Sequence, residues 1–182
     1  MADAALPKVL QKILATNSEP DAVFRALMPA LSKVLQCDRC FLYLRDPQTS
    51  IGRAAYCWCR SPEYPNVTGS DWCQEPESLP KEDPLFAAAL RAEASIFVED
   101  VETASSEVVN LAFEQKHFGH RALVHAHLCQ DKQLWGILQL CIFDQPRIWT
   151  EFDRSVIAQV EKNIAPLAAA YVKAVNISIL SG

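Results

Sequence analysis

One segment, residues 118–143, constrains the fold of this chain more than any other. Two runs in which side-chain character alternates from residue to residue flank the polar stretch Gln130–Gln133, and this pattern predicts a β-hairpin. Successive side chains of a strand point to opposite faces of the sheet. The even-numbered positions from His120 to Ile142 are almost purely apolar, which is typical of a face covered by helices.

The odd-numbered positions of the same hairpin carry a mixed chemistry. With Gln130–Gln133 as the turn, we expect His127 to pair near Trp135 and Leu123 near Gln139. This face combines aromatic, imidazole, amide and thiol groups, which favours a half-dry cavity over bulk solvent or a sealed core. The side chains predicted to bind a ligand there are Arg121, Leu123, His125, His127, Gln139 and Cys141.

Composition narrows the class of protein. A chain of 182 residues, half of them apolar and 21% charged, fits one globular domain. A net charge of −5 argues against nucleic acid or an anionic membrane as a partner. No apolar stretch approaches membrane-spanning length, and the first residues do not show a signal-peptide pattern. The seven cysteines are therefore expected to be reduced thiols in a cytoplasmic protein.

The remaining periodicities predict an α+β fold. We expect a mostly antiparallel central sheet, with N- and C-terminal helices packed on one face and with loops and short helices forming a pocket on the other. Proline is expected to kink or divide the second helix at Pro29 and to bend the last helix at Pro166. The predicted elements are helices over 5–16, 21–35, 84–92 and 105–117, strands over 38–45, 51–59 and 94–98, the hairpin, and a terminal helix that begins with the capping box of Thr150 and Asp153.

A proline-rich segment, residues 61–83, shows no regular pattern. A loop of this length in a compact domain is usually functional or mobile. We expect it to cover the cavity, with Trp72 as a ligand contact and Tyr64 beside it, although both rings could equally form a small separate cluster. The chain divides into an N-terminal helix (1–19), a domain (20–175) and a tail (176–182).

Four short segments carry a family resemblance: Cys37-Asp38-Arg39, Phe97 to Val101, Leu134-Trp135-Gly136, and Pro146-Arg147 with Trp149 to Glu151. With these, residues 20–175 resemble a GAF domain of the cyanobacterial and phytochrome-like branch. The resemblance implies a small-molecule sensory and dimerisation module. Phytochrome-like members hold a linear tetrapyrrole against the face formed here by the odd-numbered hairpin positions.

Two departures from that branch bear on the cofactor. Bilin-binding members attach the chromophore through a Cys, usually followed by His, in the helix before the hairpin, whereas this chain has neither residue in the corresponding stretch, 107–111. They also place a His in the last strand where this chain has Cys141. Covalent bilin attachment at the usual position is therefore not expected. Non-covalent binding, or attachment through Cys73 or Cys129, stays open, and the cofactor is unknown.

Other candidate chemistry has competing interpretations. His125 and His127 could share a metal, with Cys141 or a loop residue as third ligand, but pocket lining without a metal is favoured, so no metal site is predicted. Arg121 could bind an anionic group in a bidentate contact or could be solvated at the rim. Cys73, in the loop, is the cysteine expected to be most readily oxidised.

No nucleophile elbow, zinc-protease motif, phosphate loop or dinucleotide glycine pattern occurs, so no enzymatic activity is predicted. The favoured hypothesis is a regulatory module of bacterial, specifically cyanobacterial, two-component signalling. It would bind a small molecule, form a homodimer through its terminal helices and act on a histidine kinase or response-regulator module. The alternatives are a bilin photosensor and a thiol-based enzyme or redox sensor.

Overall fold

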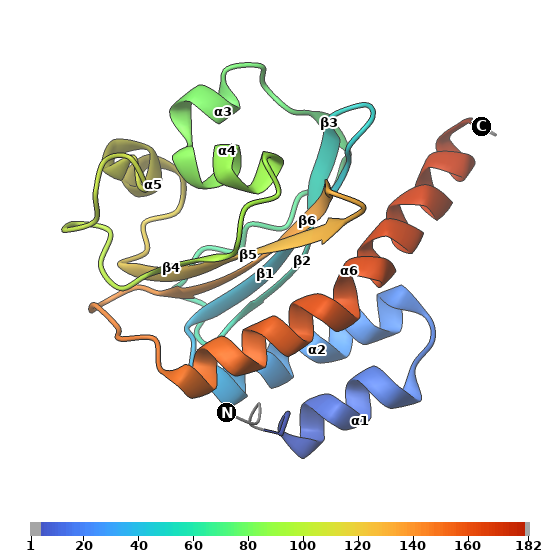
Figure 1. The fold of residues 1–182 in the computed structure, drawn as a ribbon, viewed down its shortest axis with the longest axis horizontal. Helices are drawn as coiled ribbons and strands as arrows, with labels where there is room; N and C mark the ends of the chain where they lie inside the picture. The colour runs from blue at the N-terminus through green and yellow to red at the C-terminus, as the bar shows by residue number, and fades with distance from the viewer. Residues whose placement is uncertain (1–4, 181–182) are drawn as a thin grey trace.

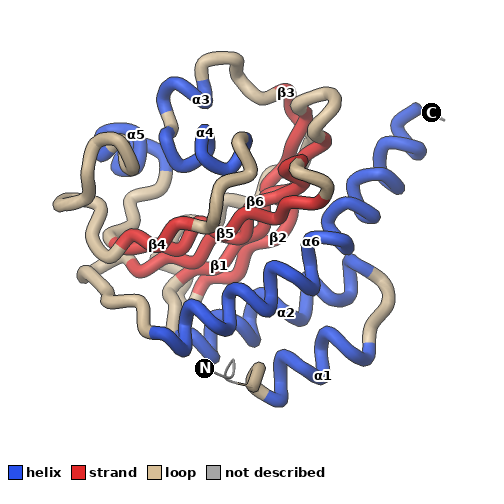
Figure 2. Tube along the Cα trace, in the orientation of Figure 1, coloured by secondary structure: helices blue, strands red, loops and turns tan. Residues whose placement is uncertain are grey.

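The computed structural model describes residues 5–180, with side chains described as far as residue 175. Within this part of the chain, six strands form one antiparallel sheet in the order β3-β2-β1-β6-β5-β4. Helices α2 and α6 cover one face, with α1 packed on the outer side of α2, and α3, α4 and α5 lie over the other face (Figures 1 and 2). The elements are α1 (Lys8–Thr16), α2 (Pro20–Leu35), β1 (Arg39–Asp46), β2 (Ile51–Cys59), β3 (Cys73–Gln74), α3 (Leu79–Glu82), α4 (Pro84–Leu90), β4 (Ile96–Val98), α5 (Leu111–His117), β5 (Ala122–Gln130), β6 (Gln133–Ile142) and α6 (Glu151–Leu180). The predicted fold class is confirmed.

Local capping signals in the sequence mark where the helices of this layer begin and end. The capping box is confirmed, because Thr150 Oγ1 accepts a hydrogen bond from the backbone of Asp153 and Asp153 Oδ2 accepts one from the backbone of Thr150. Helix α2 begins at a proline and ends at Gln36, whose φ of 52° is left-handed. Both α2 and α6 run unbroken through their internal prolines, so α2 is not divided at Pro29, while a kink at Pro29 and a bend at Pro166 stay predictions.

The main core lies between these helices and the sheet. Even-numbered hairpin residues such as Val124, Leu138 and Leu140 are fully buried against the helical layer, as predicted. Phe24 of α2 and Val160 of α6 supply the facing surface and are equally buried. Each buried side chain of this size contributes about 1.5–3 kcal/mol to folding. This layer gives the opposite face of the sheet a rigid support.

No helix in the described residues is long and apolar enough to cross a bilayer.

The register of the hairpin differs from the predicted one. The turn contains only Asp131 and Lys132, both with positive φ, which is the geometry of a tight type I′ connection. His127 pairs with Ile137, and Leu123 with Cys141. The predicted pairs, His127 with Trp135 and Leu123 with Gln139, were wrong, because a bulge next to the turn moves the register of β6.

The bulge lies in β6. Leu128 pairs with Gly136, while Cys129 pairs with Leu134, so Trp135 is an extra residue. Trp135 consequently joins the core on the helical side, where Lys173 lies 5.0 Å from its ring centroid. Leu134 turns to the opposite face. Both residues thus lie on the faces opposite to those that simple alternation predicts.

Residues 61–83 are more ordered in structure than the absence of a sequence pattern indicated. Strand β3 pairs with the edge of β2, with Gly52 opposite Cys73, and α3 follows it. Helix α5 is shorter than the predicted 105–117, since Asn110 accepts a hydrogen bond from the backbone of Phe113 and so begins the helix at Leu111.

Candidate ligand-binding site

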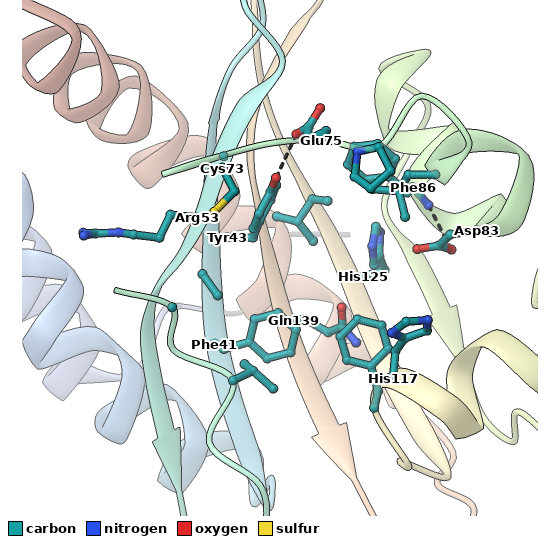
Figure 3. Close-up of a pocket in the computed structure, with 18 of the residues that line it drawn as sticks. Phe41, Tyr43, Arg53, Cys73, Glu75, Asp83, Phe86, His117, His125 and Gln139 are labelled. Carbon is teal, nitrogen blue, oxygen red and sulfur yellow. Dashed lines mark hydrogen bonds between the residues drawn. The ribbon is translucent and has the colours of Figure 1, made fainter. Parts of the chain in front are cut away.

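A cavity of about 450 Å³ lies on the sheet face opposite the long helices, within the range of small-molecule pockets. Strands β1, β2, β5 and β6 form its floor, and the 61–83 segment, α4 and α5 form its walls (Figure 3). Its lining residues are Phe41, Tyr43, Gly52, Arg53, Ala54, Val67, Gly69, Asp71, Cys73, Gln74, Glu75, Pro76, Leu79, Asp83, Phe86, Phe113, His117, Phe118, His125, Ile137 and Gln139.

Much of the cavity wall is aromatic. Phe41 of β1 and Phe118, just after α5, stack with their ring centroids 6.1 Å apart and their planes 9° from parallel. Phe86 of α4 faces the cavity from the other side, as Figure 3 shows. Flat apolar surfaces of this kind bind a planar or aromatic ligand through burial and ring stacking.

An ion pair fixes the proline-rich segment over the sheet. Glu75 accepts hydrogen bonds from Arg45 Nε at 2.7 Å and Arg45 Nη2 at 2.8 Å, and another from the Tyr43 hydroxyl at 2.9 Å. Both charged side chains are buried, with 4% and 7% of their surfaces exposed. Arg45 also donates to the carbonyl of Leu134. A bidentate pair of this kind, shielded from water, holds the segment in one position.

Hydrogen bonds set the protonation of His125. The carbonyl of Glu93 can only accept, so His127 Nδ1, 2.8 Å away, carries a hydrogen. Burial lowers the pKa of His127, and the ring is neutral, which leaves His127 Nε2 as an acceptor for His125 Nδ1 at 2.9 Å. Burial also lowers the pKa of His125 well below its usual value. His125 is therefore a neutral imidazole whose Nε2 carries a lone pair. No described residue hydrogen-bonds to that atom, and the side chain lines the cavity.

Asp83 adds a carboxyl group to the same cavity. Its side chain caps α4, accepting hydrogen bonds from the backbone of Leu85 at 3.0 Å and of Phe86 at 3.3 Å. Burial, together with the nearby charge of Glu114, raises the pKa of Asp83 to about 6. Near neutral pH the carboxyl is therefore poised between its two forms.

The raised pKa of Asp83 predicts a pH-dependent effect of Asp83→Asn. Because folding favours the protonated form, Asp83 contributes stability that is complete below about pH 4 and is lost as the pH rises through about 6. Asparagine keeps the capping oxygen and carries no charge. We expect the variant to be more stable than wild type by about 1–3 kcal/mol at pH 7.5 and to gain nothing at pH 4. Urea titrations at both pH values measure this, with Asp83→Ala, which loses the cap, as the control. An equal difference at both pH values would contradict the assignment.

Only part of the predicted ligand-binding set lies at the cavity. His125 and Gln139 line it. His127 lies behind His125, and Cys141 is fully buried beside the cavity wall. Leu123 packs in a separate apolar cluster.

The two other predicted ligand contacts lie farther away. Arg121 forms a bidentate pair with Asp100, at 2.7 and 3.0 Å, so its guanidinium already has an anionic partner. Trp72 packs against the edge of the main core, with Arg53 over its ring. In the described residues, no three His, Cys, Asp or Glu side chains converge as a metal-binding group.

Several lining residues were missed by the sequence analysis. Phe41 and Tyr43 occupy alternate positions of β1, and the alternation used for the hairpin could have found them. Glu75, Asp83 and Phe86 had no such signal, because their positions depend on how the 61–83 segment and α4 fold over the sheet. Cys73 also lines the cavity.

Comparison with known families settles the class of domain. The sequence profile of the GAF domain matches residues 19–166. The chain belongs to the GAF domain family. A search of curated proteins finds no match to this GAF domain.

Solved structures agree with this fold. The phycoerythrobilin-bound GAF domain of a cyanobacterial phytochrome is 17% identical, with a TM-score of 0.70 over 93% of this chain and 99% of that one. GAF3 of Slr1393 from Synechocystis is 22% identical, with a TM-score of 0.63 over 90% and 100%. The GAF domain of an Acinetobacter phosphoenolpyruvate-protein phosphotransferase is 14% identical, with a TM-score of 0.65 over 93% of both chains. At these identities the likeness establishes the fold alone.

Proposed function

We propose that this GAF domain is a non-enzymatic regulatory module that binds a small, largely apolar ligand in the cavity. The observation that carries the proposal is the lone pair of His125 Nε2, which no described residue uses. The atom is open to the cavity, since it is not one of the buried polar atoms without a partner in the described residues. A ligand with an N–H or O–H group can donate to it, which contributes about 0.5–1.5 kcal/mol, and the aromatic walls accommodate a planar body.

The charges around the cavity favour a neutral or cationic ligand. Asp83 and Glu75 bring carboxyl groups to the lining. Arg53 is the one lysine or arginine in this described lining, and it donates to the carbonyl of Ser70 and to the hydroxyl of Tyr171. Its guanidinium points away from the cavity in Figure 3. An anionic ligand group therefore has no cation to pair with there.

Substitution of His125 tests this assignment. A library of aromatic amines, N-heterocycles and matched aromatic carboxylates is screened by ligand-observed NMR. We expect hits from the first two classes, with affinity about threefold to tenfold lower in His125→Phe, since one hydrogen bond to the ligand is lost. His117→Phe is the matched control, because His117 also lines the cavity but is exposed. Equal losses in both variants, or hits confined to carboxylates, would refute the assignment.

The proposal includes a homodimer through the terminal helices and a signalling partner such as a histidine kinase or response-regulator module. Helix α6 supports the dimer, because its C-terminal part extends beyond the sheet and away from the other helices (Figure 1). Sedimentation velocity should then show a dimer at micromolar concentration, and removal of residues 173–182 should shift it to monomer. A wild-type monomer across that range would rule out the dimer.

Bilin binding is the second candidate function. It is favoured by the position of Cys73 in the cavity lining, where it could reach a bound chromophore. Cys129, the other cysteine considered, is not part of that lining. Co-expression with a bilin-producing pathway should give a coloured protein whose chromophore survives denaturation in Cys129→Ser and is lost in Cys73→Ser. A colourless protein would exclude this candidate.

A further inference from the structure

Behind the cavity wall lies a second group of reactive side chains, which the proposed ligand site does not use. Cys141 of β6, His120 before β5, Glu114 of α5 and Arg39 of β1 meet there, and each is at most 3% exposed. His120 Nε2 lies 2.5 Å from Glu114 Oε2, and Arg39 Nη2 lies 3.8 Å from Cys141 Sγ. The other ring nitrogen of His120, Nδ1, is buried and has no hydrogen-bond partner in the described residues, while, against the effect of burial, the charge of Cys141 raises the pKa of His120.

The buried charge of Arg39 requires an anion. Its guanidinium stays protonated in proteins. Arg39 is fully buried, donates to the carbonyl of Pro65, and forms no ion pair with a carboxylate in the described part of the chain. Glu114 is already paired with His120. Since an unpaired buried charge is strongly destabilising, the thiolate of Cys141 is the group that can neutralise Arg39.

The arrangement also favours the thiolate form of Cys141 although the sulfur is buried. Burial alone would raise the pKa of Cys141, but the positive charges of His120 and Arg39 outweigh it and lower that pKa. Burial alone would lower the pKa of His120, but the charges of Cys141 and Glu114 outweigh it and raise that pKa to about 9. Two further cysteines, Cys37 and Cys40, are as buried as Cys141, and burial raises the pKa of Cys37 to about 12.

We propose that Cys141 is a peroxide-reactive thiolate, held in a Cys–His–Glu arrangement with Arg39 as its counter-ion. The sulfur attacks one oxygen of hydrogen peroxide, the S–O bond forms and the O–O bond breaks. The sulfur loses two electrons and becomes a sulfenic acid, while the released hydroxide takes a proton from His120 and leaves as water. Glu114 acts as a positioning residue, because it orients His120 and stabilises its charge.

The cavity provides the route to this sulfur. The ring of Phe118 stacks on His120, with centroids 5.4 Å apart, and also lines the cavity. Gln139 lines the cavity too, and its amide lies 3.9 Å from Cys141 Sγ. One layer of side chains thus separates the cavity from the thiolate. Gly119, with a φ of +72°, follows Phe118 and marks a backbone turn at this wall.

Peroxide reactivity tests the proposal in the full chain. After brief treatment with hydrogen peroxide and trapping of sulfenic acid by dimedone, peptide mass spectrometry gives the rate at each cysteine. We expect Cys141 to react at least about tenfold faster than Cys37 and Cys40, which are equally buried but not ionised. Phe118→Ala should increase the rate at Cys141 alone. If Cys141 reacts as slowly as Cys37 and Cys40 in both wild type and Phe118→Ala, the proposal is wrong.

A second measurement is independent of access to the sulfur. The ultraviolet absorption of a thiolate should be present in native wild type at neutral pH and absent from Cys141→Ser. In Glu114→Gln we expect the pH at which this absorption appears to shift upward, and the oxidation rate at neutral pH to fall severalfold. Glu107→Gln, an exposed residue ahead of the same helix, is the matched control. Identical spectra for wild type and Cys141→Ser, each shown to be folded by circular dichroism, would overturn the proposal. The titratable groups outside the cluster that interact electrostatically with it are Asp83, His125, Cys37, Cys40 and Cys57.

Discussion

Replacement of Glu75 by alanine should destabilise the domain by about 3–5 kcal/mol, since it leaves Arg45 charged, buried and unpaired. The same change removes the acceptor of the Tyr43 hydroxyl. Because Glu75 is the anchor of the 61–83 segment, amide hydrogen exchange should rise there before it rises in β5 or β6. Urea titration measures the first effect, and exchange mass spectrometry the second.

Two matched variants separate charge from packing at this position. Glu75→Gln keeps the shape and one acceptor oxygen, so we expect a smaller loss than in Glu75→Ala. The double variant Arg45→Met/Glu75→Leu removes both charges and should recover most of the lost stability, as replaced buried ion pairs often do. If Glu75→Ala is as stable as wild type, the ion pair does not hold the segment in place.

Replacement of Gly136 by alanine should cost about 1–3 kcal/mol, and more if the strands cannot separate. A Cβ atom on Gly136 would lie 2.6 Å from the carbonyl oxygen of Tyr43 and 3.1 Å from a methyl group of Leu44. The oxygen belongs to the backbone of β1, so relief requires β1 and β6 to move apart. These strands form the floor of the cavity, and we expect ligand affinity to fall together with stability.

Gly69 provides the matched control for this effect. A Cβ atom there would meet only Arg53, at 3.9 Å, which is an ordinary contact. Gly69→Ala should therefore leave the midpoint of thermal unfolding almost unchanged, although Gly69 lines the same cavity. Equal losses of stability in the two alanine variants would show that the close approach of β1 to β6 does not explain the glycine at position 136.

Sequence patterns predicted the sheet and its two faces well, because alternation and helical spacing are local properties. The even-numbered hairpin residues face the helices, and His125 and Gln139 face the cavity, as expected. The register and the face of Trp135 could not be predicted in this way. The two-residue turn places Leu134 and Trp135 on the faces opposite to those predicted, and the single bulged residue restores the predicted alternation from Gly136 onward.

The composition of the site depended on contacts between distant residues. Arg121 was expected to bind a ligand, but Asp100, 21 residues earlier, occupies its guanidinium. Glu75 reaches Arg45 across 30 residues of sequence, and no local pattern indicated that pair. Cys141 likewise lies next to Arg39, 102 residues away in the sequence. Long-range pairing of charges therefore decided which polar groups remain free for a ligand.

The central claim is that the cavity holds a small molecule through the free acceptor of His125. Native mass spectrometry of the protein purified from its own host tests it most directly. We expect an additional non-covalent mass on wild type, its retention in His117→Phe and its loss in His125→Phe. Two results together would contradict the account: the wild-type protein shows the mass of the chain alone, and it binds no compound with an N–H or O–H donor in the ligand screen.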